Sequence, residues 1–242
     1  MGSAVIRFVL VFAFCSVAFA QPALVQQASN GGNSAPSGST LTVTLTSSPS
    51  SSNVLIATLS SVDTGGSYAS TITSLDGASW TQVCQATNDS NSDAEVWVGT
   101  SPSSSTVHVF TAANVSAPSV TNAQISEWSG LSSTSDKTNM GTGQSGTVAT
   151  GSITTTNAND AIFAAAGNNG AVSTGPGTGW TSFTFSYDQN HAGAYQVVSS
   201  TGTYSATWSW GGNNIWSACI AALKASTAVR VCGTLALLGV GC

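Results

Sequence analysis

The chain has 242 residues, only 5% of them are charged, and the formal net charge is −5 at pH 7. Its four Lys and Arg residues are too few to neutralise a phosphate backbone or to attract an anionic lipid surface, which argues against nucleic acid and lipid surfaces as partners. Disorder is not expected, because 41% of the residues are hydrophobic and they recur with a period.

Residues 1–20 are typical of a secretory signal peptide. Arg7 supplies the positive charge, Phe8–Val17 is a short apolar run, and Ala18-Phe19-Ala20 places small residues before a cleavage point at Gln21. The apolar run is shorter than the roughly 20 residues that span a bilayer, so we expect cleavage rather than a retained anchor. The mature protein is therefore predicted to be secreted, extracellular or at the cell surface, with no membrane span after cleavage.

The body of the chain consists of short alternating runs that Gly, Ser, Asn and Pro interrupt, which is the pattern of antiparallel strands and turns. In the first run Leu41, Val43 and Leu45 face a core, while the intervening threonines face water. The later strands are predicted at Asn53–Ser60, Ala69–Leu75, Trp80–Ala86, Ala94–Thr100, Thr106–Ala112, Asn122–Trp128, Val148–Thr154, Ala161–Gly167, Trp180–Ser186, Gly193–Ser199, Tyr204–Trp210 and Trp216–Lys224.

The second half of the chain echoes the first at an offset of roughly one hundred residues. Asn53–Ala57 recurs loosely as Asn159–Ala164, and Gly77–Thr81 recurs as Gly177–Thr181. Because the order of the motifs is kept, we predict a doubled unit of several strands, with pseudo-repeats over about 40–131 and 147–225. The Ser-, Thr- and Gly-rich segment Ser132–Gly146 is then the predicted crossover between them.

So many strands cannot form one open sheet without exposing an apolar face. The prediction is an all-β fold over residues 21–225, a two-sheet antiparallel β-sandwich of the jelly-roll-like or Greek-key kind. Two small sandwiches are the alternative, but each half has few large apolar residues, which favours a single shared core. Ile215–Ala225 could form a helix by propensity, yet its place in the repeat favours a final strand. Residues 226–242 lie outside the repeat and are predicted to be a disordered or disulfide-closed extension.

Four cysteines remain after signal cleavage, which permits two disulfides in an exported chain. The favoured pairs are Cys84–Cys219, which joins the two halves, and Cys232–Cys242, which closes the tail. A zinc site is not indicated, because no Cys-x-x-Cys motif occurs.

Asp89, Asn91 and Asp93 place oxygen ligands at alternate positions, as calcium loops do. Ala94 stands where a calcium loop has its turn glycine, and Thr100 stands where a bidentate Glu closes the shell. Calcium is the one cofactor that the sequence suggests, and a polar hairpin turn is the alternative.

Trp97, Glu95 and Asp93 share one face of the strand that follows, opposite the apolar face of Ala94–Val98. A Trp ring can stack on the apolar face of a sugar while neighbouring carboxylates bind its hydroxyls. On a solvated face these three residues would be a carbohydrate site. In the alternative, Trp97 packs beneath a loop or a neighbouring chain.

Catalytic residues are not predicted. A glycosidase needs two carboxylates facing one cleft, and Glu127 is the acid most open to this interpretation. A Ser-His-Asp hydrolase would need His108 or His191, but no Gly-x-Ser-x-Gly motif accompanies them.

The segment Glu127–Leu131, followed by Asp136, resembles the Glu-aromatic-Ser-Gly stretch of a broad group of secreted bacterial β-sandwich proteins of unassigned function. Further matches to that group are Asn53–Ile56, Gly177–Thr181 and Ser200–Thr207. The resemblance spans most of residues 25–225 and implies the sandwich fold and secretion. It transfers no catalytic or binding residue.

Three functional hypotheses follow from the sequence. The first is a secreted, non-catalytic binding or adhesion protein, with an extracellular glycan or surface polymer as its partner. The alternative is a structural subunit that self-associates through edge strands into an extracellular layer or fibre. The third is a polysaccharide-acting hydrolase.

Overall fold

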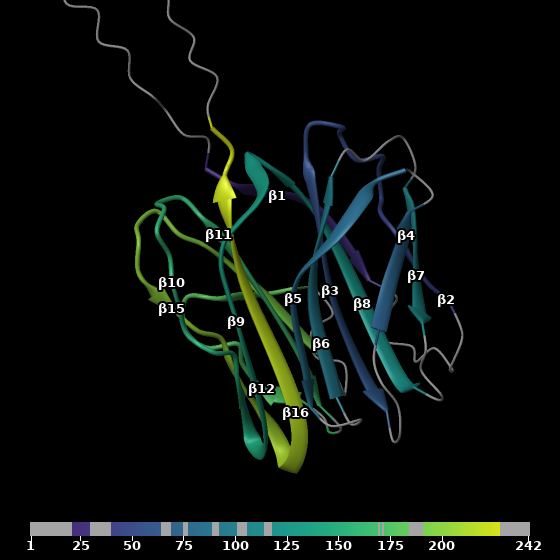
Figure 1. Cartoon of the computed structure of the whole chain (residues 1–242), viewed down its shortest axis with the longest axis vertical. Coiled ribbons are helices and arrows are strands. Elements are labelled where there is room, and N and C mark those ends of the chain that lie inside the picture. The colour runs from purple at the N-terminus through teal and green to yellow at the C-terminus, as the bar shows by residue number, and fades with distance from the viewer. Residues whose placement is uncertain are drawn as a thin grey trace, which may run out of the picture.

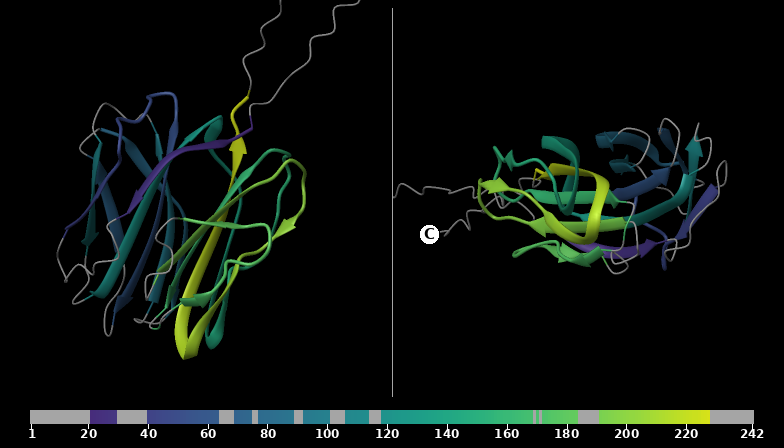
Figure 2. Two further views of the ribbon diagram at one scale, coloured as in Figure 1. Left: turned by 180° about the vertical axis from the view of Figure 1, so that it is seen from behind. Right: turned by 90° about the horizontal axis from the view of Figure 1, so that it is seen from below.

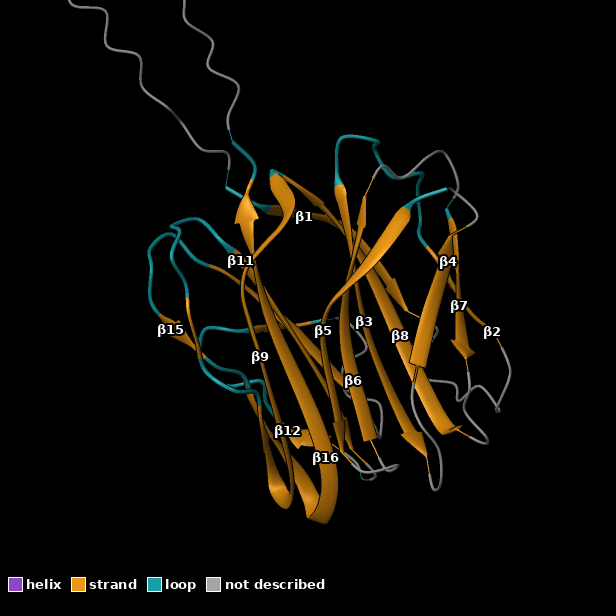
Figure 3. Cartoon of the chain, viewed as in Figure 1, coloured by secondary structure: helices purple, strands orange, loops and turns teal. Residues whose placement is uncertain are grey.

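The computed structural model describes residues 21–29, 40–63, 69–74, 77–88, 92–100, 106–113, 118–168, 170, 172–183 and 191–227. Within these ranges the regular structure is entirely β-strand, and the strands pair in antiparallel fashion, which confirms the predicted fold class (Figure 3). The strands are β1 (Ala23–Ser29), β2 (Thr40–Thr44), β3 (Val54–Asp63), β4 (Ala69–Ser74), β5 (Ser79–Asn88), β6 (Ser92–Thr100), β7 (Val107–Ala113), β8 (Pro118–Ser129), β9 (Leu131–Ala149), β10 (Ile153–Thr154), β11 (Ala161–Asn168), β12 (Val172–Thr174), β13 (Thr181–Ser182), β14 (His191–Val197), β15 (Thr203–Tyr204) and β16 (Thr207–Ala225).

Two inner sheets pack face to face and form the β-sandwich (Figure 1). The first inner sheet has the order β1-β8-β3-β6-β5, and the second has the order β9-β16-β11-β14-β13. A first outer sheet, β2-β7-β4, covers the far face of the first inner sheet, and a second outer layer that contains β10, β12 and β15 covers the far face of the second. The views from behind and from below show the same layering (Figure 2).

The two halves of the chain have the same strand order. The strand order β1-β8-β3-β6-β5 in the inner sheet of the first half corresponds strand by strand to β9-β16-β11-β14-β13 in the second. In the outer layers β2 and β4 both pair with β7, and β10 pairs with β15 in the same way as β2 with β7. The halves differ in that β12, the counterpart of β4, pairs with the start of β16. Pairing of the first strand with the eighth, the second with the seventh and the third with the sixth is the wrapping of a jelly roll. Each half is therefore a jelly roll with a core of its own, as in the alternative of two small sandwiches. The largest core is the predicted shared one and lies between the two.

The predicted crossover Ser132–Gly146 is a strand and not a linker. It belongs to β9, which pairs with β16 along nearly its whole length. Most side chains of β9 are exposed or half-buried, because β9 is an edge strand of its sheet among the described residues. An edge strand needs few apolar side chains, so its composition resembled that of a loop. Ile215–Ala225, for which a helix was the alternative, lies in β16 as predicted.

The core between the inner sheets combines bulky and small side chains from both halves of the chain. Trp128 of β8 is fully buried, and its ring meets those of Phe163 and Tyr195 edge-on, each with a centroid distance of 5.0 Å. Such aromatic pairs add about 0.5–1.5 kcal/mol each beyond the area that they bury. Ala165 and Ala221 are also fully buried in this core, and their short side chains leave room for these rings.

At the other end of this core the two sheets approach each other more closely. A Cβ atom at Gly167 of β11 would lie 2.4 Å from the backbone oxygen of Asp93 on β6, and one at Gly193 of β14 would lie 3.0 Å from Oγ1 of Thr58. Only a residue without a side chain fits at Gly167, because the atom opposite belongs to the backbone and cannot rotate away.

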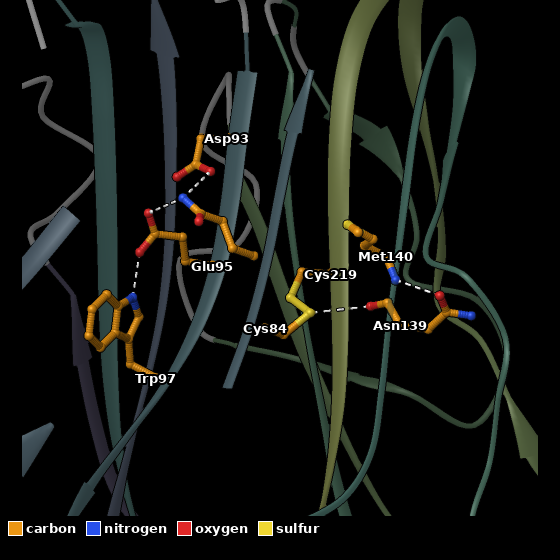
Figure 4. Close-up of a disulfide and its surroundings, with 8 residues drawn as sticks. Cys84, Asp93, Glu95, Trp97, Asn139, Met140 and Cys219 are labelled. Carbon is orange, nitrogen blue, oxygen red and sulfur yellow. Dashed lines mark hydrogen bonds between the residues drawn. A yellow bond between two sulfur atoms is a disulfide. The ribbon is translucent and has the colours of Figure 1, made fainter. Parts of the chain in front are cut away.

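The predicted disulfide Cys84–Cys219 is present, with a Cα–Cα distance of 6.0 Å (Figure 4). It links β5 of the first jelly roll to β16 of the second across 135 residues of sequence. The second predicted pair, Cys232–Cys242, lies outside the described residues, as does the signal peptide. Of the extension 226–242, the described part is Ser226 and Thr227, and the N–H of Ser226 donates to the carbonyl of Gly130.

Replacing both cysteines of this disulfide by alanine is expected to lower the free energy of unfolding by about 3–5 kcal/mol, because the bond closes a long loop in the unfolded chain. Urea unfolding of the oxidised wild type and of the Cys84→Ala/Cys219→Ala variant measures the difference. Wild type with the disulfide reduced is the control, and its free energy of unfolding should fall by a similar amount. Equal midpoints for the oxidised wild type and the variant would contradict the assignment.

The Gly167→Ala variant is expected to lose about 1–3 kcal/mol of unfolding free energy, because the added methyl group overlaps the backbone of β6. Gly211→Ala is the matched control, since a Cβ atom there meets nothing within 4 Å. Chemical denaturation of both variants tests the packing of the inner sheets. A Gly167→Ala variant as stable as Gly211→Ala would show that the sheets do not approach as described.

Candidate functional site

The predicted carbohydrate residues Asp93, Glu95 and Trp97 lie together on one face of β6, but that face is not solvated. Figure 4 shows the three side chains on the same side of the strand. Asp93 and Glu95 are fully buried, and Trp97 is half-buried. The expectation of a solvent-exposed face is wrong, because the first outer sheet lies over this side of the first inner sheet. The sequence alternation identifies two faces of β6 correctly, and both are covered.

The acids of β6 are held by neighbouring side chains. The indole Nε1 of Trp97 donates to Glu95, while Nε2 of Gln85 donates to Asp93 at 3.2 Å and to Glu95 at 3.3 Å. Burial raises the pKa of Asp93 well above its ordinary value, and the negative charge of Glu95 raises it further. This arrangement is an internal polar contact between strands β5 and β6, and a glycan does not reach its two carboxyl groups.

Of the predicted calcium ligands, Asp89 and Asn91 lie outside the described residues. Asp93 is described, and its carboxyl group points into the buried contact with Gln85. In the ranges that the structure describes, no three His, Cys, Asp or Glu side chains gather as metal ligands would. Calcium binding by this loop stays a prediction.

A pocket of about 490 Å³ lies where the two jelly rolls meet at the end of β16, and we call it the junction pocket. Four separate segments line it, namely the loop before β3, the end of β6, the start of β9 and the end of β16. Hydroxyl groups predominate, and Lys224 is the charged residue among those that line the pocket. The lining residues are Ser51, Ser52, Asn53, Val54, Thr100, Leu131, Ser132, Ser133, Thr134, Lys224, Ala225, Ser226 and Thr227.

A second pocket of about 350 Å³ lies on the other side of the end of β16. It is lined by Thr156–Asn159 of the loop before β11 and shares Lys224, Ala225 and Thr227 with the junction pocket. The loops before β3 and β11 occupy equivalent places in the two jelly rolls, so the repeat brings two similar loops to opposite sides of Lys224.

In the first jelly roll Glu127 of β8 anchors the loop before β3. Its carboxylate accepts hydrogen bonds from Nδ2 of Asn53 at 2.7 Å, from the N–H of Ser50 at 2.8 Å and from Nε2 of Gln26 at 2.6 Å. Glu127 was the acid considered for catalysis in the sequence analysis. Its carboxylate instead accepts three hydrogen bonds that fix the loop lining the junction pocket.

In the second jelly roll the equivalent loop is anchored by Asp136 of β9. Its carboxylate accepts from the N–H of Thr156 at 2.6 Å, from the hydroxyl of Thr156 and from Nδ2 of Asn157 at 2.9 Å. Partial burial acts to raise the pKa of Asp136, but the hydrogen bonds from Thr156 and the charge of Lys224 outweigh it and lower the pKa.

Asp160 occupies the place in the second jelly roll that Asn53 has in the first, directly before the third strand of its half. Its side chain is inaccessible to solvent, and an ionised Asp160 would have no hydrogen-bond donor, whereas a protonated one can donate to Asp136. Burial raises the pKa of Asp160 to about 7, the charge of Asp136 adds to the rise, and Lys224 opposes it. Sequence reasoning missed this pair, since Asp136 lies in the segment that was predicted to be a crossover and the repeat matched Asn53 with Asn159 rather than with Asp160.

His191, one of the two histidines considered for hydrolysis, is buried between the inner sheets. Its Nδ1 lies 2.7 Å from Oγ of Ser60, which joins β14 of the second jelly roll to β3 of the first. Burial lowers the pKa of His191 to about 3, so the ring is neutral at ordinary pH. The pair is closed to a substrate and links the two halves. The side chain of His108 lies outside the described part of the structure.

No protein-family model matches the chain, and searches of curated proteins and of solved structures found no match. The resemblance to secreted bacterial β-sandwich proteins stays a prediction. Among the described residues, no helix is long and apolar enough to cross a membrane. The disulfide is typical of proteins that mature outside the reducing cytosol. Function has to be inferred from the residues of this chain, because the fold alone does not define it.

The Asp160→Asn variant is expected to change how stability depends on pH. Between about pH 4 and 7 folded wild type holds a proton that the unfolded chain has lost, so its unfolding free energy falls as pH rises, by up to about 1.4 kcal/mol per pH unit. The variant lacks this loss of unfolding free energy. The difference in unfolding free energy between the variant and wild type should therefore grow in favour of the variant from pH 4 to 7 and stay constant above pH 8. Urea unfolding at several pH values measures it, and an advantage that is constant with pH would contradict the burial of this carboxyl group.

Proposed function

We propose that this protein is an extracellular, non-catalytic binding or adhesion protein that holds a carbohydrate in the junction pocket. Secretion is proposed on the predicted signal peptide, and the disulfide Cys84–Cys219 supports it. The observation that carries the proposal is the pocket itself, with its volume of about 490 Å³ and its lining of hydroxyl groups at the meeting of two jelly rolls.

The chemistry of the lining suits a polyhydroxylated ligand. Each Ser or Thr hydroxyl can both donate and accept a hydrogen bond, and so can each hydroxyl of a sugar. Asn53 contributes an amide to the same wall, and the contact of its Nδ2 with Glu127 fixes its orientation. A volume of this size lies in the ordinary range of small-molecule sites and accommodates one or two sugar rings.

This proposal moves the carbohydrate site from the residues that the sequence suggested. Trp97 donates its indole N–H to Glu95, and the carboxyl groups beside it are buried. The junction pocket, in contrast, is lined mostly by exposed or half-buried residues that carry hydroxyl groups.

A structural subunit is the second candidate, and the length of β9 favours it. The 19 residues of this edge strand pair with β16 on one side, and an open strand edge is a template for another strand. Part of the free edge is already occupied, since Asn88 donates to the carbonyl of Gly143 and the sulfur of Cys84 lies 3.2 Å from that of Asn139. Concentration-dependent light scattering or filaments would promote this candidate.

The third hypothesis, a polysaccharide-acting hydrolase, is not proposed. Glu127 is engaged by the loop that it anchors, and no observation on the described residues favours catalysis by it.

Polysaccharide pull-down and a glycan array with the mature chain 21–242 test the binding proposal. Wild type should be retained, and Ser133→Leu should bind about tenfold more weakly, because an apolar side chain displaces a hydroxyl and fills part of the pocket. Thr142→Leu is the control, an exposed residue of the same strand outside the pocket.

Two outcomes of this experiment would contradict the proposal. If wild type binds no glycan, carbohydrate binding is wrong. If Trp97→Phe abolishes binding and Ser133→Leu does not, the ligand binds at β6 and the junction pocket is the wrong site.

A further inference from the structure

We propose that the junction pocket selects sugars that carry a carboxylate, that the ammonium of Lys224 binds this carboxylate, and that the buried carboxyl group of Asp160 controls how available the ammonium is. The inference rests on the proposed function and adds the class of sugar and its regulation.

Lys224 is the charged residue of the junction pocket. It stands at the end of β16, is half-buried, and lines both pockets beside that strand. The hydrogen bonds that Asp136 accepts come from Thr156 and Asn157, so that carboxylate does not depend on the ammonium for its contacts. An ammonium among hydroxyl groups is a site for a carboxylate whose sugar ring carries further hydroxyls.

The net charge around Lys224 depends on Asp160. When Asp160 is neutral, the positive charge of Lys224 balances the negative charge of Asp136. When Asp160 is ionised, the three groups carry one net negative charge, which repels an anionic ligand at short range. The ammonium then interacts with two carboxylates on its own chain, and a sugar carboxylate competes with both.

Comparison of the two jelly rolls indicates that the neutral form of Asp160 is the one that the fold accommodates. In the first half the amide of Asn53 donates to the anchoring carboxylate of Glu127 at 2.7 Å. In the second half Asp160 stands in the place of Asn53, beside the anchoring carboxylate of Asp136. A protonated carboxyl group is a donor like the amide, whereas an ionised one cannot donate.

The burial of Asp160 supports the same form, because an ionised carboxylate without a hydrogen-bond partner is costly in the interior. Its raised pKa agrees with this. The charged groups that face Asp160 are Asp136 from β9 and Lys224 from β16. The adjoining residues Gln196 and Val197 of β14, Val198 after it and Thr156–Asn159 of the loop carry no ionisable side chain.

Calorimetry with oligogalacturonate and with its methyl ester tests the ligand class, because these two probes differ in charge and share the sugar. At pH 5.5 wild type should bind the carboxylated form about tenfold more tightly than the ester. Lys224→Gln should lose this preference and Lys224→Arg should keep it. Lys137→Gln is the control, since it removes an exposed cation of β9 outside the pocket.

The same titrations at pH 8.5 and constant ionic strength test the proton, since the ligand carboxylate is ionised at both pH values. Wild type should bind oligogalacturonate about tenfold more weakly at pH 8.5, while Asp160→Asn should bind equally at both. A ligand-free measurement accompanies this: the carboxyl carbon signal of Asp160 in an NMR titration should change with a midpoint near pH 7.

Equal affinity for the acid and the ester, or an unchanged preference in Lys224→Gln, would overturn the inference and leave the proposed function standing. Failure of every glycan to bind would overturn both. The role of the proton is overturned if Asp160 titrates near pH 4, or if Asp160→Asn shows the same loss of affinity at pH 8.5 as wild type.

Discussion

Face-to-face packing of the two inner sheets is the constraint on which the rest of the structure depends. The sheets can approach because β11 carries alanines and Gly167 where β6 passes, and Cys84–Cys219 holds the strands β5 and β16 together. With these faces occupied, each jelly roll covers its other face with its own outer strands. The equivalent loops before β3 and β11 then arrive at the same end of the molecule, on either side of β16. The junction pocket is a result of this packing and belongs to neither half alone.

The fold was largely predictable from sequence because alternation and duplication are both local patterns. Alternation identifies the two faces of a strand, and the repeat requires that equivalent strands have equivalent neighbours. Neither pattern states how many layers cover a face. The alternation therefore predicted that Asp93 and Glu95 face solvent, although a further sheet covers them. Strand β9 was missed for the opposite reason, since an edge strand with exposed side chains has the composition of a linker.

The candidate site was not predictable, because it has no motif. Ser51, Ser133 and Lys224 come from distant segments, and Ser and Thr are frequent throughout this chain. Only the packing of the two halves distinguishes these hydroxyls from the many others. The repeat in the sequence matched Asn53 with Asn159, and the strand bounds of the structure show that Asp160 is its counterpart. The importance of Asp160 comes from Asp136, which lies on a strand that the sequence did not reveal.

The two halves hold equivalent loops in place with different side chains. Both must fix the loop before their third strand, and each uses a carboxylate: Glu127 from β8 in the first half and Asp136 from β9 in the second. In the first half an amide, Asn53, completes the arrangement, and an amide does not titrate. In the second half Asp160 has this place, and a carboxyl group does titrate. Two jelly rolls of the same topology thus place two different side chains near Lys224. Asn53 does not change its charge with pH, whereas Asp160 does.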